Sequence, residues 1–175
     1  MTRDVSPGRS VWKLRMIRFV LFVFGRAAQV LSRIDPEVRR EVSRWPEGFV
    51  IRYTVLPHGP SMVLARTRAG RLAYRGGGDD GAPAGLTVAL KNVRSALLIF
   101  TFRVGMQQAY AQNRVSVRGD VPTALSQMRV LNRVLAYMLP EKVVRRITLR
   151  TPEIGPFRKY VSRGFLYLFG IPFGV

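Results

Sequence analysis

Apolar residues near the start of the chain recur at three- and four-residue steps, a spacing that predicts a helix from residue 10 to about residue 34. Basic residues are interspersed among them. Asp35 and Pro36 then predict a second, short helix that ends before Pro46, because Asp favours the N-cap and Pro the first helical position. The apolar positions of the first helix are Trp12, Met16, Phe19, Val20, Val23, Ala27, Val30, Leu31 and Ile34.

Five short segments have the pattern of β-strands. In the first of them, Ile51, Tyr53 and Val55 fall on one face of an extended chain, and Arg52 falls on the other. Glycine- and proline-containing turns separate the segments. The predicted strands are residues 49–55, 62–66, 71–74, 86–90 and 114–118.

The second half of the chain is mainly helical. Asn92 is a predicted cap for an apolar helix that Gly105 interrupts, and Asp120 is a predicted cap for a long helix that Pro140 closes. Strands followed by helices predict an α+β fold, a five-stranded, mainly antiparallel sheet covered on one face by helices. We expect the long helix to bury Leu125, Met128, Leu131, Leu135 and Met138, and to show Gln127, Asn132 and Arg133 to water.

Charge restricts the possible partners of the protein. The 175 residues include 29 Lys and Arg against 10 Asp and Glu, a net charge of +19. Such a field attracts nucleic acid or the anionic face of a membrane, and does not itself choose between them. The apolar fraction of 47% suffices for a packed core.

Residue types that carry chemistry are few. There is no cysteine, which excludes disulfides and thiol catalysis, and His58 is the only histidine. We therefore expect no metal ion, no cofactor and no enzymatic activity. The apolar run Phe19–Phe24 is far shorter than the ~20 residues that a spanning helix needs. We expect a bacterial cytoplasmic protein that is peripheral on the inner membrane.

The order of elements between Trp45 and Pro140 resembles the sterol carrier protein 2 (SCP2) family. The residues that carry the resemblance are the strand Leu86–Leu90, the apolar helix Asn92–Phe102, Gly105 with Ala109-Tyr110-Ala111, the strand Arg114–Arg118 ending in Gly119-Asp120, and Ala124-Leu125. The length and the helical lead-in also look like the SCP2-type accessory proteins of bacterial ubiquinone biosynthesis. The expected domains are an amphipathic extension at 1–44, an SCP2-like domain at 45–140 and a basic, hydrophobic segment at 141–175.

The resemblance implies a lipid tunnel between the sheet and its helices, and binding without catalysis. The ligand would be an acyl or isoprenoid chain, and biosynthetic enzymes would be partners. The apolar helix can equally be ordinary core, but Met adapts to varied partners and suits a tunnel wall. The candidate lipid-binding residues are Leu97, Leu98, Phe100, Phe102, Met106, Tyr110, Leu125, Met128, Leu131 and Leu135.

Both ends of the chain mix aromatic and basic residues in a way typical of interfacial membrane anchors. Two alternatives stay open: the first helix can pack on the domain, and the C-terminal run can fold back as a lid. The candidate membrane-contact residues are Trp12, Lys13, Arg15, Arg18, Phe19, Phe22, Phe165 and Phe169.

Two other functions compete with lipid binding. Nucleic-acid binding is favoured by the charge, but the basic residues alternate with large apolar ones and no recognised binding signature is present. An enzyme would have to use His58 or Asp120. Asp120 is better explained as a helix cap, and His58 as an exposed turn residue.

Overall fold

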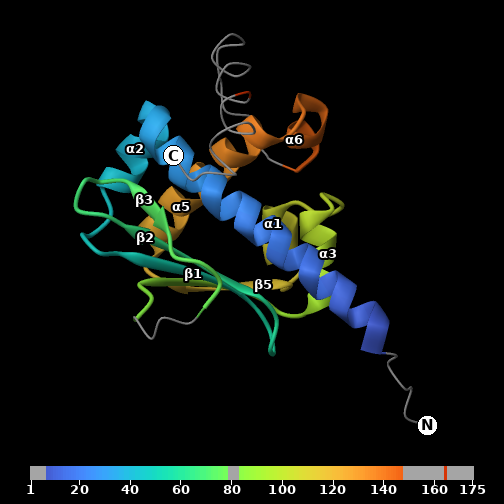
Figure 1. Cartoon of the computed structure of the whole chain (residues 1–175). Helices are drawn as coiled ribbons and strands as arrows, with labels where there is room; N and C mark the ends of the chain where they lie inside the picture. Colours follow the sequence, from blue (N-terminus) through green and yellow to red (C-terminus); the bar gives the residue numbers. More distant parts are fainter. Residues whose placement is uncertain (1–6, 79–82, 148–163, 165–175) are drawn as a thin grey trace.

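The computed structural model describes residues 7–78, 83–147 and 164 of the chain. Its elements follow the order that the sequence predicts (Figure 1). The first helix begins at Pro7, three residues before the predicted start, since proline is well suited to the first turn. The elements are α1 Pro7–Ile34, α2 Pro36–Ser43, β1 Val50–Val55, β2 Ser61–Arg66, β3 Leu72–Tyr74, β4 Leu86–Leu90, α3 Val93–Phe100, α4 Met106–Ala111, β5 Val115–Gly119, α5 Val121–Met138 and α6 Glu141–Ile147.

The five strands form one sheet in the order β3-β2-β1-β4-β5. Only β1 and β4 pair in parallel; the other neighbours are antiparallel. The predicted mainly antiparallel sheet is therefore confirmed. One row on the helix-covered face runs from Met62 through Tyr53 and Val88 to Val117, across four strands. Three residues of this row, Tyr53, Val88 and Val117, line the candidate site.

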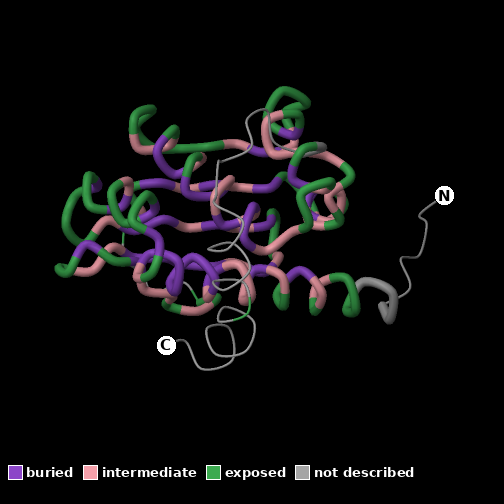
Figure 2. Tube along the Cα trace, turned by 90° about the horizontal axis from the view of Figure 1, so that it is seen from above, coloured by how far each residue is buried: buried purple, intermediate pink, exposed green. Residues whose placement is uncertain are grey.

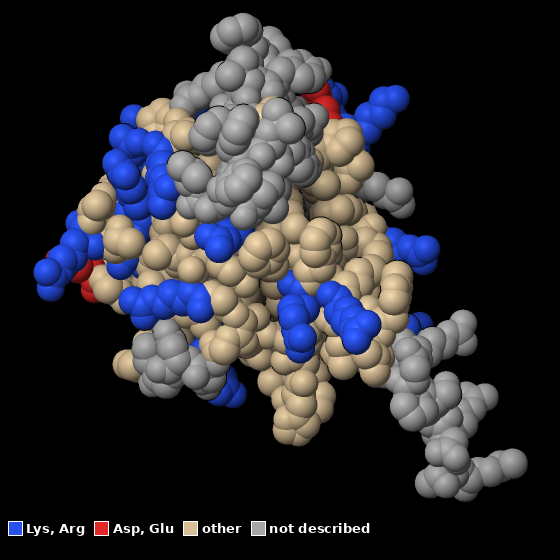
Figure 3. Space-filling model, viewed as in Figure 1, with Lys and Arg blue, Asp and Glu red and all other residues tan. Residues whose placement is uncertain are grey.

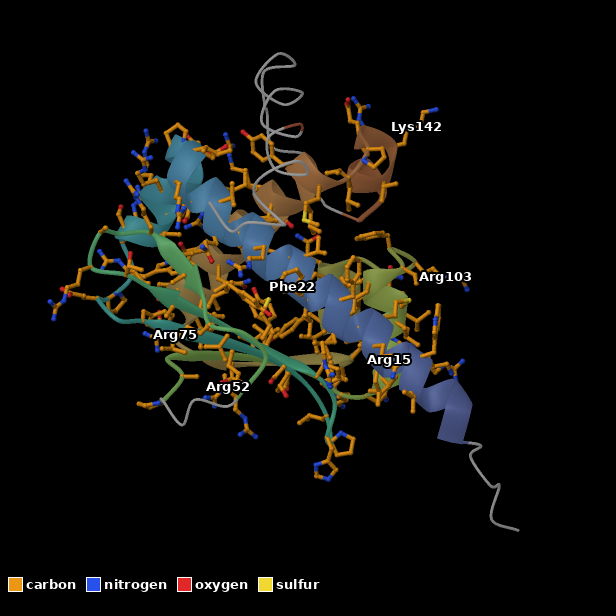
Figure 4. All side chains as sticks on the ribbon, viewed as in Figure 1. Arg15, Phe22, Arg52, Arg75, Arg103 and Lys142 are labelled. Carbon is orange, nitrogen blue, oxygen red and sulfur yellow. The ribbon has the colours of Figure 1, made fainter. Side chains whose placement is uncertain are left out.

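Helices cover one face of the sheet, which confirms the predicted layering (Figures 1 and 2). Helix α1 packs on β2 and β3, and α4 and α5 pack on β5. On the opposite face, Arg52 and Arg75 point away from the helical layer (Figure 4). In Figure 2 buried residues run through the middle of the molecule, and exposed residues gather in its outer loops.

The two halves of α1 have different surroundings. Ala27, Val30 and Leu31 are fully buried, whereas Trp12 is 67% and Phe19 65% exposed. The close approach of α1 to β3 depends on a glycine: a Cβ atom on Gly25 would lie 2.4 Å from the Tyr74 ring. The C-terminal half of α1 is thus part of the core, and the N-terminal half presents large apolar side chains to solvent.

Helix α2 is held against α5 by a buried carboxylate. Asp35 caps α2 by accepting hydrogen bonds from the backbone N–H groups of Glu37 and Val38, at 2.8 and 3.1 Å. The same carboxylate accepts a hydrogen bond from Tyr137 Oη at 2.6 Å and pairs with Arg133 at 3.0 Å. Since Asp35 is fully buried, these donors replace the water that it loses on folding.

Candidate functional site

An apolar cavity of about 280 Å³ lies between the β5 side of the sheet and helices α4 and α5. Tyr53, Val88 and Val117 form its floor, and residues of α4 and α5 form its walls. Gly119 at the end of β5 and Ala124 on α5 contribute little side-chain volume to this space. We call it the edge cavity, because β5 is one of the two edge strands of the sheet. Its lining residues are Tyr53, Val88, Met106, Tyr110, Val115, Val117, Gly119, Val121, Ala124, Leu125, Gln127, Met128 and Leu131.

The tight turn between β5 and α5 creates this arrangement. Gly119 has φ 144°, a conformation that favours glycine, and a Cβ atom there would lie 2.7 Å from the carbonyl oxygen of Gly85. The Asp120 carboxylate then accepts a hydrogen bond from the Thr123 N–H at 2.8 Å and caps α5. This hydrogen bond also lowers the pKa of Asp120. The chain therefore turns directly from the cavity floor into the helix above it.

The mouth of the edge cavity has an apolar rim. Tyr110, Val117, Val121 and Leu125 line the cavity and are also exposed, Val121 by 69% and Tyr110 by 59%. Large apolar side chains gathered on a surface are typical of interaction sites or ligand grooves. An apolar guest at this mouth would cover side chains that otherwise face water.

A second, smaller cavity of about 80 Å³ lies among α1, α3, α4 and α5. We call it the helix cavity. Tyr53, Met106 and Leu131 line both cavities and separate them. Met106 is a flexible, unbranched side chain, so this partition is easily moved. Other residues that line the helix cavity include Val20, Leu21, Phe24, Ile99, Phe100, Phe102, Leu135 and Met138.

One polar pair interrupts the apolar lining of the edge cavity. The Gln127 amide donates a hydrogen bond from Nε2 to Tyr53 Oη, and both side chains are buried. Burial raises the pKa of the Tyr53 hydroxyl well above its ordinary value, so the group is neutral. Among the described residues, none that lines either cavity carries a charge. The site is suited to an uncharged or mainly apolar guest.

The sequence pattern did not reveal this pair, and the prediction that Gln127 faces water is wrong. Gln127 is 6% exposed, whereas Leu125, predicted to be buried, is 56% exposed. Arg133, also predicted to face water, is largely covered through its pair with Asp35. Gln127 lies three residues after Ala124 and four before Leu131, in the middle of the inward stripe. That spacing was the available signal, and the polarity of the amide obscured it.

The predicted lipid-binding residues fall into four groups. Met106 and Leu131 line both cavities, and Tyr110, Leu125 and Met128 line the edge cavity. Phe100, Phe102 and Leu135 line the helix cavity. Leu97 and Leu98 line neither; Leu97 packs against the hydrophobic core. Their contact with a lipid stays a prediction.

The predicted membrane-contact residues on α1 lie mostly on its exposed part. Trp12, Lys13, Arg15, Arg18 and Phe19 are exposed. Figure 4 shows Arg15 towards the N-terminal end of α1 and Phe22 near its middle. Phe165 and Phe169 lie outside the described residues.

Phe22 is less exposed than the residues before it. Its ring meets Tyr74 edge-on at 5.8 Å, and the Arg26 guanidinium lies over both rings at 5.7 and 5.6 Å.

Within the part of the chain that the structure describes, no helix has the length and hydropathy of a membrane span.

The two residues that an enzyme would have to use both lie at the surface. His58 is exposed in the turn between β1 and β2. Asp120 is exposed, and its carboxylate is engaged in capping α5. Neither side chain lines one of the two cavities.

Several solved SCP2 structures are similar to this chain. No protein-family model matches the sequence, and no curated protein matches it. The chain is similar to the sterol carrier protein domain 2 of Helicoverpa armigera, with 13% identity and a TM-score of 0.46 over 69% of this chain and 92% of that one. It is also similar to sterol carrier protein 2 from Yarrowia lipolytica in its apo form, with 14% identity and a TM-score of 0.45 over 65% and 88%.

A third similar structure is described as a UbiJ-SCP2 ubiquinone synthesis protein. It shares 18% identity at a TM-score of 0.37, over 60% of this chain and 95% of that one. All three TM-scores are below 0.5 and all three identities below 20%. All three are described as sterol carrier protein or SCP2 structures.

Proposed function

We propose that this protein is a non-enzymatic lipid-binding protein that holds an acyl or isoprenoid chain in the edge cavity. The observation that carries the proposal is the uncharged lining of that cavity together with its exposed apolar rim. Ligand pockets are typically concave, mostly apolar and largely preformed. The edge cavity, as lined by the described residues, has these properties.

The energetics favour a hydrocarbon guest. A methylene group removed from water contributes about 0.8 kcal/mol, so a ten-carbon segment contributes roughly 8 kcal/mol before ordering costs. A volume of about 280 Å³ lies just below the ~300–1,000 Å³ of typical ligand pockets. The cavity therefore suits part of a long lipid, and the exposed rim suits the remainder.

We further propose that the N-terminal half of α1 docks the protein on anionic membranes. Trp12 and Phe19 are the apolar side chains that would enter the headgroup boundary, and Lys13, Arg15 and Arg18 would contact phosphates. Each basic residue near an anionic surface contributes about 1 kcal/mol. Figure 3 shows basic side chains spread over this face of the molecule with few acidic ones. Reversible attachment to the inner face of a bacterial inner membrane would follow.

The pathway belongs to the same proposal. The resemblance of the sequence to SCP2-type accessory proteins suggests a role in isoprenoid quinone biosynthesis, presenting a prenylated intermediate to biosynthetic enzymes. The identity of the bound lipid is the measurement that addresses it: a prenylated aromatic compound supports this role, and a phospholipid or fatty acid opposes it.

The direct test is lipid extraction and native mass spectrometry of the purified full chain, with uptake of fluorescent acyl and prenyl probes. Ala124→Phe, which places a ring inside the edge cavity, should abolish uptake. Ala111→Phe adds the same ring at an exposed position of α4 outside both cavities and should leave uptake unchanged. Finding no co-purifying lipid and no uptake by the unmodified protein would refute the proposal.

Nucleic-acid binding is the second candidate, because of the net charge of +19. Phosphate contacts would make such binding fall steeply with salt. Binding to duplex or single-stranded nucleic acid with a steep salt slope, together with no binding to anionic vesicles, would favour this alternative over membrane docking.

A further inference from the structure

The edge cavity contains hydrogen-bonding capacity that the fold does not use. A glutamine amide has two N–H donors and a carbonyl acceptor, and a tyrosine hydroxyl both donates and accepts. One Gln127 N–H is spent on Tyr53 Oη. Within the described part of the chain, no other hydrogen bond involves these two side chains. The pair retains a hydroxyl donor, an amide donor and a carbonyl acceptor.

These unused groups are almost entirely withdrawn from bulk solvent. Tyr53 is 5% and Gln127 6% exposed, and both line the edge cavity. Buried polar groups in folded proteins are nearly always hydrogen-bonded, to protein or to water, so a ligand that enters the cavity can use the capacity that remains here. The space that both side chains line in the described part of the chain is the edge cavity.

Resting on the proposed lipid-binding function, we propose that Tyr53 and Gln127 bind an uncharged polar head group of the lipid at the inner end of the edge cavity. The head group carries a hydroxyl or a carbonyl, as in a phenol, a quinone or an alcohol. The pair can serve both kinds, because it offers donors and an acceptor together.

The absence of charge from the described lining excludes ionised head groups. Burying a carboxylate or phosphate without a cation is far more costly than burying a hydroxyl that finds a partner. Fatty acids and phospholipids therefore fit this inner end poorly, whereas neutral prenylated or alkylated ring compounds fit it well.

The same geometry sets the direction of the ligand. The polar pair lies at the inner wall, since Tyr53 also borders the helix cavity. The mouth is apolar, with Tyr110, Val121 and Leu125 exposed around it. With the head at the inner wall, the chain leads outwards and its emerging part lies against this rim. A head group at the mouth would leave both the polar pair and the rim without a function.

Three matched ligands test the inference on the full chain: 4-dodecylphenol, dodecylbenzene and 4-dodecylbenzoate at pH 8. They share one tail and one ring and differ in a single group. Each is titrated against a bound fluorescent hydrocarbon, diphenylhexatriene, and its displacement is measured. The phenol should bind about tenfold more tightly than dodecylbenzene, the difference expected for well-placed hydrogen bonds. The ionised benzoate should bind most weakly.

The decisive variant is Tyr53→Phe/Gln127→Leu. Gln127→Leu alone would leave the buried Tyr53 hydroxyl without its hydrogen-bond donor. The double variant removes both partners and leaves neither polar group unsatisfied, so we expect it to fold. It should bind the phenol and dodecylbenzene about equally. Gln108→Leu, the same change at an exposed position of α4 outside both cavities, should keep the preference for the phenol.

The outcomes separate the two proposals. If none of the ligands displaces the probe, the lipid-binding function itself fails. If all three displace it equally, or if the double variant keeps the preference for the phenol, lipid binding stands and the role of Tyr53 and Gln127 is wrong.

Discussion

At the scale of single residues, the most consequential group outside the cavities is the Asp35 carboxylate. Burial alone would raise its pKa, but hydrogen bonds from Tyr137, the Val38 N–H and Arg133, together with the charge of Arg133, outweigh burial and lower the pKa. One carboxylate thus caps α2 and joins the helical lead-in to α5. Its ionised form is the one that the fold requires.

Replacing Asp35 by Asn should destabilise the protein strongly. The substitution removes the charge that compensates the largely covered Arg133 guanidinium, and breaking a buried pair in this way costs about 3–5 kcal/mol. Glu37→Gln changes the same functional group in an exposed pair on the first turn of α2 and should cost less than about 1 kcal/mol. Urea denaturation at pH 7 measures both; equal midpoints would contradict a structural role for Asp35.

The lowered pKa of Asp35 also predicts acid sensitivity. A carboxyl whose pKa is lower in the folded than in the unfolded state stabilises the fold at pH values above its unfolded-state pKa. This stability is lost as the pH falls through its folded-state pKa. The free energy of unfolding should therefore decrease below about pH 4. Repeating the denaturation between pH 3 and 7 tests this, because Asp35→Asn should flatten that part of the profile.

At the scale of elements, the sequence predicted what local chemistry determines. Asp35, Asn92 and Asp120 were predicted as helix caps, and each accepts the expected backbone hydrogen bond. The pairing of Asp35 with Arg133, 98 residues later, was not predictable, because no local pattern encodes it. The same holds for the parallel pairing of β1 with β4, on which the row Tyr53–Val88–Val117 and hence the cavity floor depend.

The packing of α1 on β3 requires a residue without a side chain at Gly25. Gly25→Ala places a methyl group 2.4 Å from the Tyr74 ring and 3.0 Å from the Met62 sulfur, so the helix or the ring must shift. Overpacking of this kind costs about 1–3 kcal/mol and should lower Tm. In a Tyr74→Leu background, where the ring is absent, the loss should be smaller. The same loss in both backgrounds would show that the ring is not the obstacle.

The partition between the edge cavity and the helix cavity is formed by side chains from three elements, α4, α5 and β1. Met106→Ala should join the edge and helix cavities and shift the preferred chain length of an alkyl ligand upwards by several carbons. Met128→Ala removes the same kind of side chain at a position that lines the edge cavity and not the helix cavity. It should change the preferred chain length less. A series of 4-alkylphenols from octyl to hexadecyl measures the shift, and identical optima in both variants would argue against a movable partition.

At the scale of the whole molecule, the exposed part of α1 combines basic and aromatic side chains, whereas the edge cavity is lined by uncharged ones. The exposed aromatic residues Trp12 and Phe19 share a helix with Lys13, Arg15 and Arg18, whereas the lining of the edge cavity holds no charge among the described residues. The proposed membrane contact and the proposed lipid site use separate residues. A variant can therefore weaken one without altering the other.

Membrane docking by α1 is distinguished from general attraction by charge reversal at two matched places. Arg15→Glu/Arg18→Glu should weaken binding to phosphatidylglycerol vesicles by at least about tenfold, since each basic residue near the surface contributes about 1 kcal/mol. Arg71→Glu/Arg94→Glu makes the same change in net charge at exposed positions before β3 and on α3, and should have a smaller effect. Vesicle co-sedimentation at fixed salt provides the measurement.

Uptake of the diphenylhexatriene probe should be the same in both charge-reversal variants, because none of the four arginines lines a cavity. If the two variants lose vesicle binding equally, the net charge of +19 attracts the membrane as a whole and α1 is not the docking element. If Arg15→Glu/Arg18→Glu alone loses it, the exposed half of α1 is the contact, and its aromatic side chains add what charge alone does not supply.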